Sequence, residues 1–462
     1  MNHISQERIS DSGAINTIDL DGRIKLMAGR DVLLGEVFEL LPLTMQHFKS
    51  CLALFFVFVI EAWEMMIIVY TSPQIAKEFS LDAFQVGNLI GAIFVGIGVG
   101  SIIWGMLIDK LGRKMTIILS LILYGIVSLI SVFSPDYGVL YATRFLSGVA
   151  GAGMLVVTFP YFAELLPVKW RGRLTVYLAS GWPIGMLFAL AATVYIEPIG
   201  WRWTIGVSSL AALWFVAVAF FVPESPYWLA SVGRQKAARD AILRLSGGKI
   251  VIPNNANLVI KTSKKSAWQE TFAGPMFKLT IIQLALNFTF SWGYWGLQTW
   301  LPTLLQQRGF SVPQSYSFVA ISAICMIPGY ITASYFTGKF GRKKVLVAYI
   351  ASAALSGYAF ANAESMNAVL ASNLALSFFS LGAWGVWDTW IAELYPTRVR
   401  MIGYSWAIFS QRLANIAAPT VIGALVAQGA SYNLTTTFIN AFMVASAVLA
   451  LFLPETEGQD LQ

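Results

Sequence analysis

The stretch GMLIDKLGRK at residues 105–114 has a second, altered copy, SYFTGKFGRK, at residues 334–343. Another pair, AELLPVKWR at 163–171 and AELYPTRVR at 392–400, repeats at the same offset (334 − 105 = 229 and 392 − 163 = 229). Two independent motifs that share one offset are hard to obtain by chance. The sequence therefore predicts two homologous halves.

Composition places both halves in a membrane. Hydrophobic residues make up 57% of the 462 residues and charged residues 12%, against roughly 45–50% and about 25% in soluble chains. Since about 20 apolar residues cross a bilayer as a helix, the chain holds twelve candidate spans, at 51–72, 85–108, 115–133, 138–161, 174–195, 203–222, 277–301, 315–337, 345–362, 368–391, 403–427 and 434–453. This pattern excludes disorder, a nucleic-acid-binding module and an ordinary soluble enzyme.

The polar stretch 223–276 separates six spans from six. We predict an all-α membrane protein, with twelve transmembrane helices in two homologous six-helix bundles. The predicted parts are a cytosolic arm (1–48), a first bundle (49–222), a cytosolic inter-bundle loop (223–276), a second bundle (277–453) and a cytosolic tail (454–462).

Basic residues predict the orientation. Of 31 Lys and Arg, Lys77, Arg202 and Arg308 lie in loops predicted to be external, and Arg144 and Arg412 lie within spans. The other 26 fall on the side of the two termini. Because basic loops stay in the cytoplasm, we expect both termini there. The short external loops favour a bacterial inner membrane over other plasma membranes.

The cysteine and histidine content of the chain indicates that it is not an enzyme. Cys51 and Cys325 lie in apolar runs, and the two histidines, His3 and His47, lie near the N-terminus. They form no disulfide framework or metal cluster, and there is no Ser/His/Asp set. The glycines of GVAGAG (148–153) lie within a span and predict helix packing. We expect no cofactor or metal.

Several motifs carry a family resemblance. GMLIDKLGRK resembles the signature loop of the major facilitator superfamily, although its second copy has Gly338 in place of Asp109. RFLSGVAGAG (144–153) resembles the span-4 motif of that superfamily. PESPYWL (223–229), PETEG (454–458) and SQRLANIAAP (410–419) resemble elements of its sugar-porter and organic-ion branch, with Tyr227 at a position that is usually Arg. The resemblance implies a transporter that works by alternating access, generally as a monomer.

A finer resemblance lies around the first span. LPLTMQHF (41–48) is similar to the lead-in of the synaptic-vesicle-glycoprotein-like branch, which includes niacin and aromatic-acid transporters. That branch usually carries two aspartates in span 1, where this sequence has Glu61 and Glu64. The resemblance implies symport of a metabolite with protons.

Ionisable residues within spans are candidates for proton coupling. A charge at the bilayer centre costs at least ~2.5–3.5 kcal/mol and usually serves a function there. Glu61 and Glu64 are three residues apart, so they share a helix face near the midplane. Arg144 and Asp388 complete the predicted coupling set. The alternatives are structural ion pairs of the acids with Arg144 or Arg412, and a place for Asp388 in the inner gate.

Arg412 lies near mid-depth, and its planar fork suits a carboxylate. Aromatic residues crowd spans 7 and 10, and aromatic walls suit a flat ring or an alkylammonium ion. The predicted substrate-binding residues are Arg412, Asn287, Trp292, Trp295, Gln298, Trp384 and Trp387. The alternatives are a permanent salt bridge for Arg412 and an interfacial aromatic belt for the tryptophans.

The repeated loop motifs predict gating instead of substrate chemistry. Their charged residues are expected to form networks that tie the halves together when the transporter faces outward. This predicted set contains Asp109, Arg113, Glu164, Arg171, Arg342, Glu393 and Arg400.

The favoured function is proton-coupled symport of a small organic solute, preferably an aromatic or heteroaromatic carboxylate. An organic-cation or drug transporter is the first alternative, with Glu61 and Glu64 binding the cation. A sugar porter is the second, but span 7 lacks the paired glutamines usual in that group. A non-transporting membrane sensor would require loss of the coupling groups, yet both acids are present.

Overall fold

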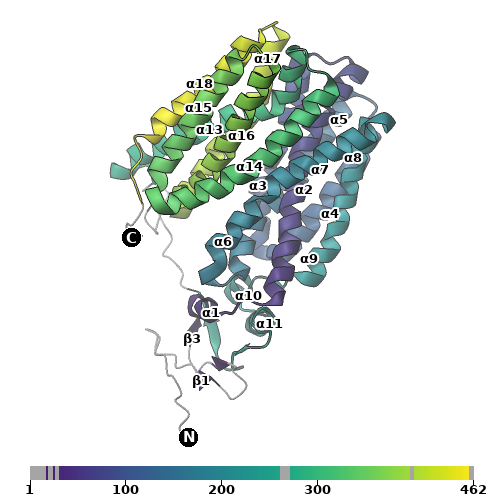
Figure 1. Ribbon diagram of the computed structural model, residues 1–462. Helices are drawn as coiled ribbons and strands as arrows, with labels where there is room; N and C mark the ends of the chain where they lie inside the picture. Colours follow the sequence, from purple (N-terminus) through teal and green to yellow (C-terminus); the bar gives the residue numbers. More distant parts are fainter. Residues whose placement is uncertain (1–16, 19–23, 26–30, 261–270, 396–399, 457–462) are drawn as a thin grey trace.

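The computed structural model describes residues 17–18, 24–25, 31–260, 271–395 and 400–456. The long helices form two bundles that lean against each other (Figure 1). We call the side on which the helix that starts at Met45 begins and the helix that finishes at Ala450 ends the termini side, and the opposite side the far side. The first bundle contains α2 (Met45–Phe79), α3 (Ala83–Leu111), α4 (Arg113–Val132), α5 (Tyr137–Leu165), α6 (Val168–Ala179), α7 (Gly181–Ile196), α8 (Trp201–Val207) and α9 (Phe215–Phe221).

In the second bundle each span is a single helix without interruption. This bundle contains α13 (Gly274–Gln307), α14 (Val312–Phe340), α15 (Arg342–Asn362), α16 (Met366–Glu393), α17 (Arg400–Ala427) and α18 (Tyr432–Ala450). Each predicted span lies on a helix or a helix pair, which confirms the fold of twelve transmembrane helices. Several helices are longer than predicted: α2 has 35 residues, about 52 Å at 1.5 Å per residue, so its ends extend beyond a bilayer core.

Among the described residues, ten helical segments are long and apolar enough to cross a membrane by length and composition. The two remaining spans, α13 and α17, carry buried polar side chains such as Gln283, Asn287 and Gln411. Their lower hydropathy therefore has a local cause: Asn287 and Gln411 hydrogen-bond to each other inside the protein.

Two predicted spans are interrupted. The span predicted at 174–195 divides at Ser180 into α6 and α7. Pro183 follows closely and cannot donate the backbone hydrogen bond that would continue the helix. The span predicted at 203–222 contains a 3₁₀ segment, η2 (Ser208–Trp214), between α8 and α9, and a shorter 3₁₀ turn, η1 (Glu197–Ile199), precedes α8.

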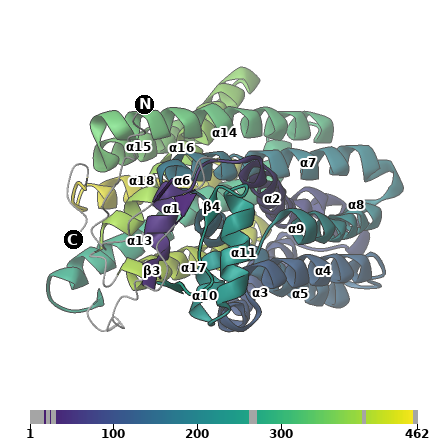
Figure 2. The same cartoon turned by 90° about the horizontal axis from the view of Figure 1, so that it is seen from below.

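A small α/β unit lies at the termini end of the first bundle. Strand β3 (Asp31–Leu33) pairs in parallel with β5 (Asn257–Val259), and β2 (Ile24–Lys25) pairs with β1 (Thr17–Ile18) and β4 (Ile250–Val251). Three short helices complete the unit: α1 (Leu34–Leu40), α10 (Pro226–Ser231) and α11 (Gln235–Leu245). Figure 2 shows α10 and α11 across the end of the first bundle. Their apolar residues share one buried core with that bundle.

Glycines bring the two bundles close together on the far side. A Cβ on Gly87 of α3 would lie 2.5 Å from the carbonyl oxygen of Pro419 in α17, and one on Gly423 would lie 2.5 Å from the carbonyl oxygen of Ala83. The Tyr316 hydroxyl of α14 also donates to the backbone oxygen of Tyr70 in α2, at 2.9 Å. These contacts close the far side.

Candidate functional site

Glu64 lies inside the first bundle. Its side chain is 1% exposed, and its Oε1 accepts a hydrogen bond of 2.9 Å from Ser147 Oγ in α5. A Cβ on Gly151, one helical turn further along α5, would lie 1.9 Å from Glu64 Oε2. The Glu64 carboxyl group therefore occupies the space that is left by the missing side chain of Gly151.

Arg144 is fully buried in α5. It donates to Ser131 Oγ of α4 and interacts electrostatically with Glu64 and Tyr124. Its Nε and Nη1 have no hydrogen-bond partner. Glu64 and Arg144 thus belong to one buried polar cluster, together with the hydroxyl groups of α4 and α5.

Glu61 connects the two bundles electrostatically. It is 1% exposed, and its carboxyl group interacts with Arg412 of α17 and with Glu64. Arg412 comes from the second half, whereas both acids come from the first. Charges of opposite sign therefore attract each other across the interface between the halves.

Asn287 organises the second bundle beside Arg412. Its Oδ1 accepts hydrogen bonds from Trp387 Nε1 at 2.7 Å and from Gln411 Nε2 at 2.8 Å. Its Nδ2 donates to the backbone oxygen of Gln283. One buried amide thus connects α13, α16 and α17. Gln411 precedes Arg412 in the chain, so this bond also fixes the part of α17 that carries the arginine.

Aromatic rings also join the two halves. The Trp295 ring of α13 lies 4.8 Å from Phe94 of α3 and 5.4 Å from Trp182 of α7, between centroids. Trp182 Nε1 donates to the Tyr294 hydroxyl at 3.1 Å, and the Tyr294 ring contacts Trp384 at 5.8 Å. Trp295 and Trp384, both predicted from the sequence, therefore belong to one aromatic cluster that spans both bundles.

Four further residues of these clusters were not predicted from the sequence: Trp182, Tyr294, Phe94 and Gln411. The three aromatic residues lie within apolar runs, so their types alone do not distinguish them from core residues. Gln411 is polar but uncharged, so it carries a weaker signal than the neighbouring Arg412. Position next to a predicted residue was a further available signal, since Tyr294 precedes Trp295 and Gln411 precedes Arg412.

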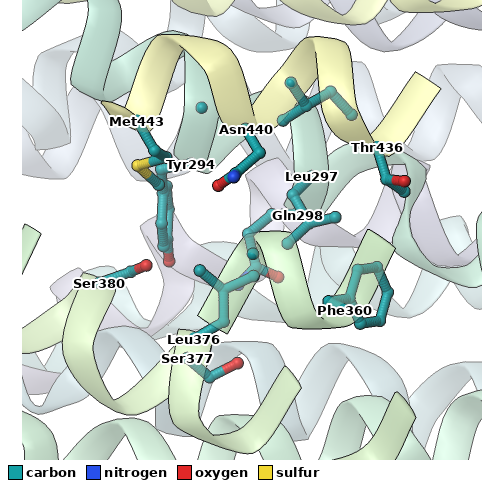
Figure 3. Close-up of a pocket in the computed structure, with 13 residues that line it drawn as sticks. Tyr294, Leu297, Gln298, Phe360, Leu376, Ser377, Ser380, Thr436, Asn440 and Met443 are labelled. Carbon is teal, nitrogen blue, oxygen red and sulfur yellow. The ribbon is translucent and has the colours of Figure 1, made fainter. Parts of the chain in front are cut away.

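Two predicted substrate-binding residues lie apart from this cluster. Trp292 stacks on Phe442 of α18, at 4.7 Å between ring centroids and 20° between planes, so its contacts lie within the second bundle. Gln298 lines a small pocket between α13, α15, α16 and α18, also within that bundle (Figure 3).

Three of the predicted gating residues of the first half, Asp109, Arg113 and Glu164, form a network at its termini end. Arg113 donates to both carboxylate oxygens of Glu164, at 3.1 and 3.2 Å, and lies 3.9 Å from Asp109. Asp109 is 83% exposed in its side chain. Arg171 donates to the backbone oxygen of Leu166. The Arg113–Glu164 pair is internal to one half, so its role in tying the halves together in an outward-facing state stays a prediction.

Glu224, of the PESPYWL motif, caps this network. It accepts hydrogen bonds from the backbone N–H groups of Arg113 and Lys114, where Gly112 turns the chain at φ +89°. Any Cβ at Gly112 would lie 2.5 Å from Glu224 Oε2. Burial raises the pKa of the Glu224 carboxyl, while these N–H groups favour its charged form.

The second half repeats this cap. Glu455, of the PETEG motif, accepts from the backbone N–H groups of Arg342 and Lys343 at 3.0 and 3.2 Å, and Gly341 turns the chain at φ +93°. From the sequence, both motifs were predicted only as family markers, without a structural role. The predicted residues Asp388, Glu393 and Arg400 have side chains outside the described part of the structure.

Comparison with known proteins identifies the family. The family model described as "Sugar (and other) transporter" matches residues 43–462. The chain belongs to this family. It is therefore a membrane transporter of the major facilitator type, and not an enzyme.

Similar proteins cover most of the chain. It is 29% identical over 428 residues to the niacin transporter NiaP of Acinetobacter baylyi, covering 92% of this chain and 98% of that protein. It is 25% identical to the synaptic vesicle 2-related protein of Xenopus laevis, covering 87% of this chain and 77% of that protein. The fold matches a partially occluded inward open conformation of the E. coli xylose transporter XylE, with a TM-score of 0.73 and 18% identity, over 90% of this chain and all of that one.

Proposed function

We propose that this protein couples protons to the transport of a small aromatic or heteroaromatic carboxylate. The observation that carries the proposal is the electrostatic attraction between Glu61 of the first half and Arg412 of the second. The aromatic cluster of Trp182, Tyr294, Trp295 and Trp384 joins the same two halves. A guanidinium binds a carboxylate with two parallel hydrogen bonds, and aromatic walls suit a flat ring. The site thus offers both parts that such a substrate requires.

Glu61 provides a simple coupling mechanism. When Glu61 is ionised, it attracts Arg412 and competes with an anionic substrate for the guanidinium. Protonation removes that competing charge, so a proton on Glu61 favours binding of a carboxylate to Arg412. A proton and a substrate anion then enter together, and the net charge at the buried site stays unchanged.

Glu64 supplies a second proton-accepting group. It is buried beside Arg144, and burial of an ionised carboxylate is costly unless it is paired. Protonation of Glu64 would release Arg144 to its hydroxyl partners in α4. We propose Glu61, Glu64, Arg144 and Asp388 as the coupling set, with the loop motifs as gates.

The relatives support the substrate class, since the Acinetobacter protein is named a niacin transporter and niacin is a heteroaromatic carboxylate. The excess of basic residues on the termini side supports cytoplasmic termini. We further propose a monomer in a bacterial inner membrane, driven by the proton gradient without a cofactor.

An organic cation is the second candidate substrate. Glu61 Oε2 is buried without a hydrogen-bond partner, and a cation could bind there. Arg412 opposes this assignment, because it would repel a cation at the same place.

Ligand-induced thermal stabilisation of the purified protein tests the proposal. The panel contains aromatic carboxylates, organic cations and sugars, each at acidic and neutral pH. Stabilisation by a carboxylate that strengthens at acidic pH is the expected result. Stabilisation by cations that strengthens at neutral pH would replace the proposal with the cation alternative.

A further inference from the structure

Tyr294 stands between two environments. On one side its hydroxyl accepts a hydrogen bond from Trp182 of the first half. On the other side Tyr294 lines the small pocket inside the second half. Tyr294 therefore takes part both in the interface between the halves and in the wall of this internal pocket.

Two polar side chains that line the pocket have atoms without a hydrogen-bond partner. Ser380 Oγ of α16 and Asn440 Oδ1 of α18 are both buried and have no hydrogen-bond partner. Figure 3 shows the Tyr294 ring along the pocket wall, with its hydroxyl toward the end that holds Ser380. A buried polar group without a hydrogen-bond partner lowers the stability of the folded protein by about 1–3 kcal/mol. We therefore expect Ser380 and Asn440 to gain a partner in another state of the protein.

The local sequence allows Tyr294 to move. Gly293 and Gly296 flank it in the middle of α13, and each lies against a flexible side-chain end, of Met443 and Ile422 respectively. Glycine inside a helix lowers the cost of bending it. The segment of α13 that carries Tyr294 is thus suited to a local change.

We propose that Tyr294 is a two-position residue that exchanges its partner during the transport cycle. In the present state, with the far side closed, the hydroxyl bonds to Trp182. When the halves separate on the far side, Trp182 withdraws and the Tyr294 hydroxyl turns into the pocket to bond with Ser380 and Asn440. The exchange keeps the hydroxyl satisfied in both states, and it moves the ring that contacts Trp384 in the candidate site.

A cysteine-accessibility experiment measures the balance between these states without any knowledge of the substrate. Cys51 and Cys325 are replaced by serine, and Thr420→Cys is the reporter. Thr420 Oγ1 lies 3.2 Å from the position of a Cβ on Gly91 of the other half, so separation of the halves on the far side exposes it. The readout is the rate of maleimide labelling of the purified protein.

Trp182→Phe removes the donor of the closed state, and we expect it to raise the labelling rate about two- to tenfold, the range for one buried hydrogen bond. Adding Ser380→Ala to Trp182→Phe should reverse part of that gain. In a Tyr294→Phe background, Ser380→Ala should have no effect. Ser380→Thr retains the hydroxyl and should behave as the parent protein.

Thr436→Val is the matched control. Thr436 lines the same pocket, but its hydroxyl is already bonded to the Tyr432 backbone oxygen, so its loss should leave labelling unchanged. Equal effects of Ser380→Ala with and without the Tyr294 hydroxyl would overturn the proposal. So would unchanged labelling in Trp182→Phe. Tyr294→Phe is conservative, and its thermal unfolding midpoint establishes that it folds.

Discussion

Glu64 occupies space that Gly151 leaves open: a Cβ at residue 151 would lie 1.9 Å from Glu64 Oε2. The sequence pattern GVAGAG predicted helix packing, and Gly148 fits that prediction, since its Cβ would lie 2.1 Å from the Ile93 backbone oxygen. Gly151 has a different structural role, because it lies against the buried carboxyl group of Glu64. One glycine motif thus serves both packing and the position of a proposed proton carrier.

Gly151→Ala should lower transport at least tenfold, because the added methyl displaces the Glu64 carboxyl from Ser147. Uptake into proteoliposomes measures this loss. Gly98→Ala in α3 is the matched control, since the nearest atom to a Cβ there lies at an ordinary contact distance of 4.0 Å, and it should transport normally. Normal transport by Gly151→Ala would mean that the position of the Glu64 carboxyl does not matter.

Glu64→Gln should abolish proton-driven accumulation but retain exchange of substrate down its own gradient. The amide keeps the shape and a hydrogen-bond acceptor for Ser147 but cannot release a proton. Counterflow in the same proteoliposomes serves as the internal control for folding and binding. Accumulation at the parent level would remove Glu64 from the coupling set.

Arg412→Lys should weaken binding of an anionic substrate about tenfold, since lysine keeps the charge but lacks the planar fork. Titration of the purified variant by calorimetry measures the affinity. If the affinity is intact, Arg412 has a structural role and another group binds the carboxylate.

Gly87→Ala should shift the transporter toward the state that is open on the far side. The new methyl would lie 2.5 Å from the Pro419 backbone oxygen, which a rigid helix cannot easily accommodate. Labelling of Thr420→Cys reports the shift. Gly98→Ala on the same helix faces α17 at an ordinary contact distance of 4.0 Å, and it should label at the parent rate. Equal rates for the two alanine variants would contradict closure by glycine contact.

Glu224→Ala should destabilise the first half by about 1–3 kcal/mol, because it leaves the backbone N–H groups of Arg113 and Lys114 without their acceptor. A lower thermal unfolding midpoint is the expected result. Glu455→Ala should have a comparable effect through the second cap. An unchanged midpoint in both variants would show that the two turns do not depend on these caps.

Much of the fold could be predicted because hydropathy and the repeat act locally. Twelve spans and two homologous halves follow from apolar runs and one shared offset. The small α/β unit could not be predicted in this way, since β3 and β5 are more than 200 residues apart in the chain and each has three residues. Such short strands give no periodic signal.

The candidate site could be predicted mainly through its charges. Glu61, Glu64 and Arg412 stand out because ionised groups within a span are costly. Trp182 and Tyr294 do not stand out, because an aromatic residue in an apolar run has the same sequence signal as a core residue. Trp292 illustrates the same ambiguity, since its ring contacts lie within the second bundle; its part in binding stays a prediction.

Uptake of radiolabelled niacin into proteoliposomes, with and without an imposed inward proton gradient, tests the central claim most directly. Coupled symport predicts accumulation above the external concentration under the gradient, and its collapse when a protonophore is added. Equal uptake with and without the gradient, at a concentration where niacin stabilises the purified protein, would contradict proton coupling.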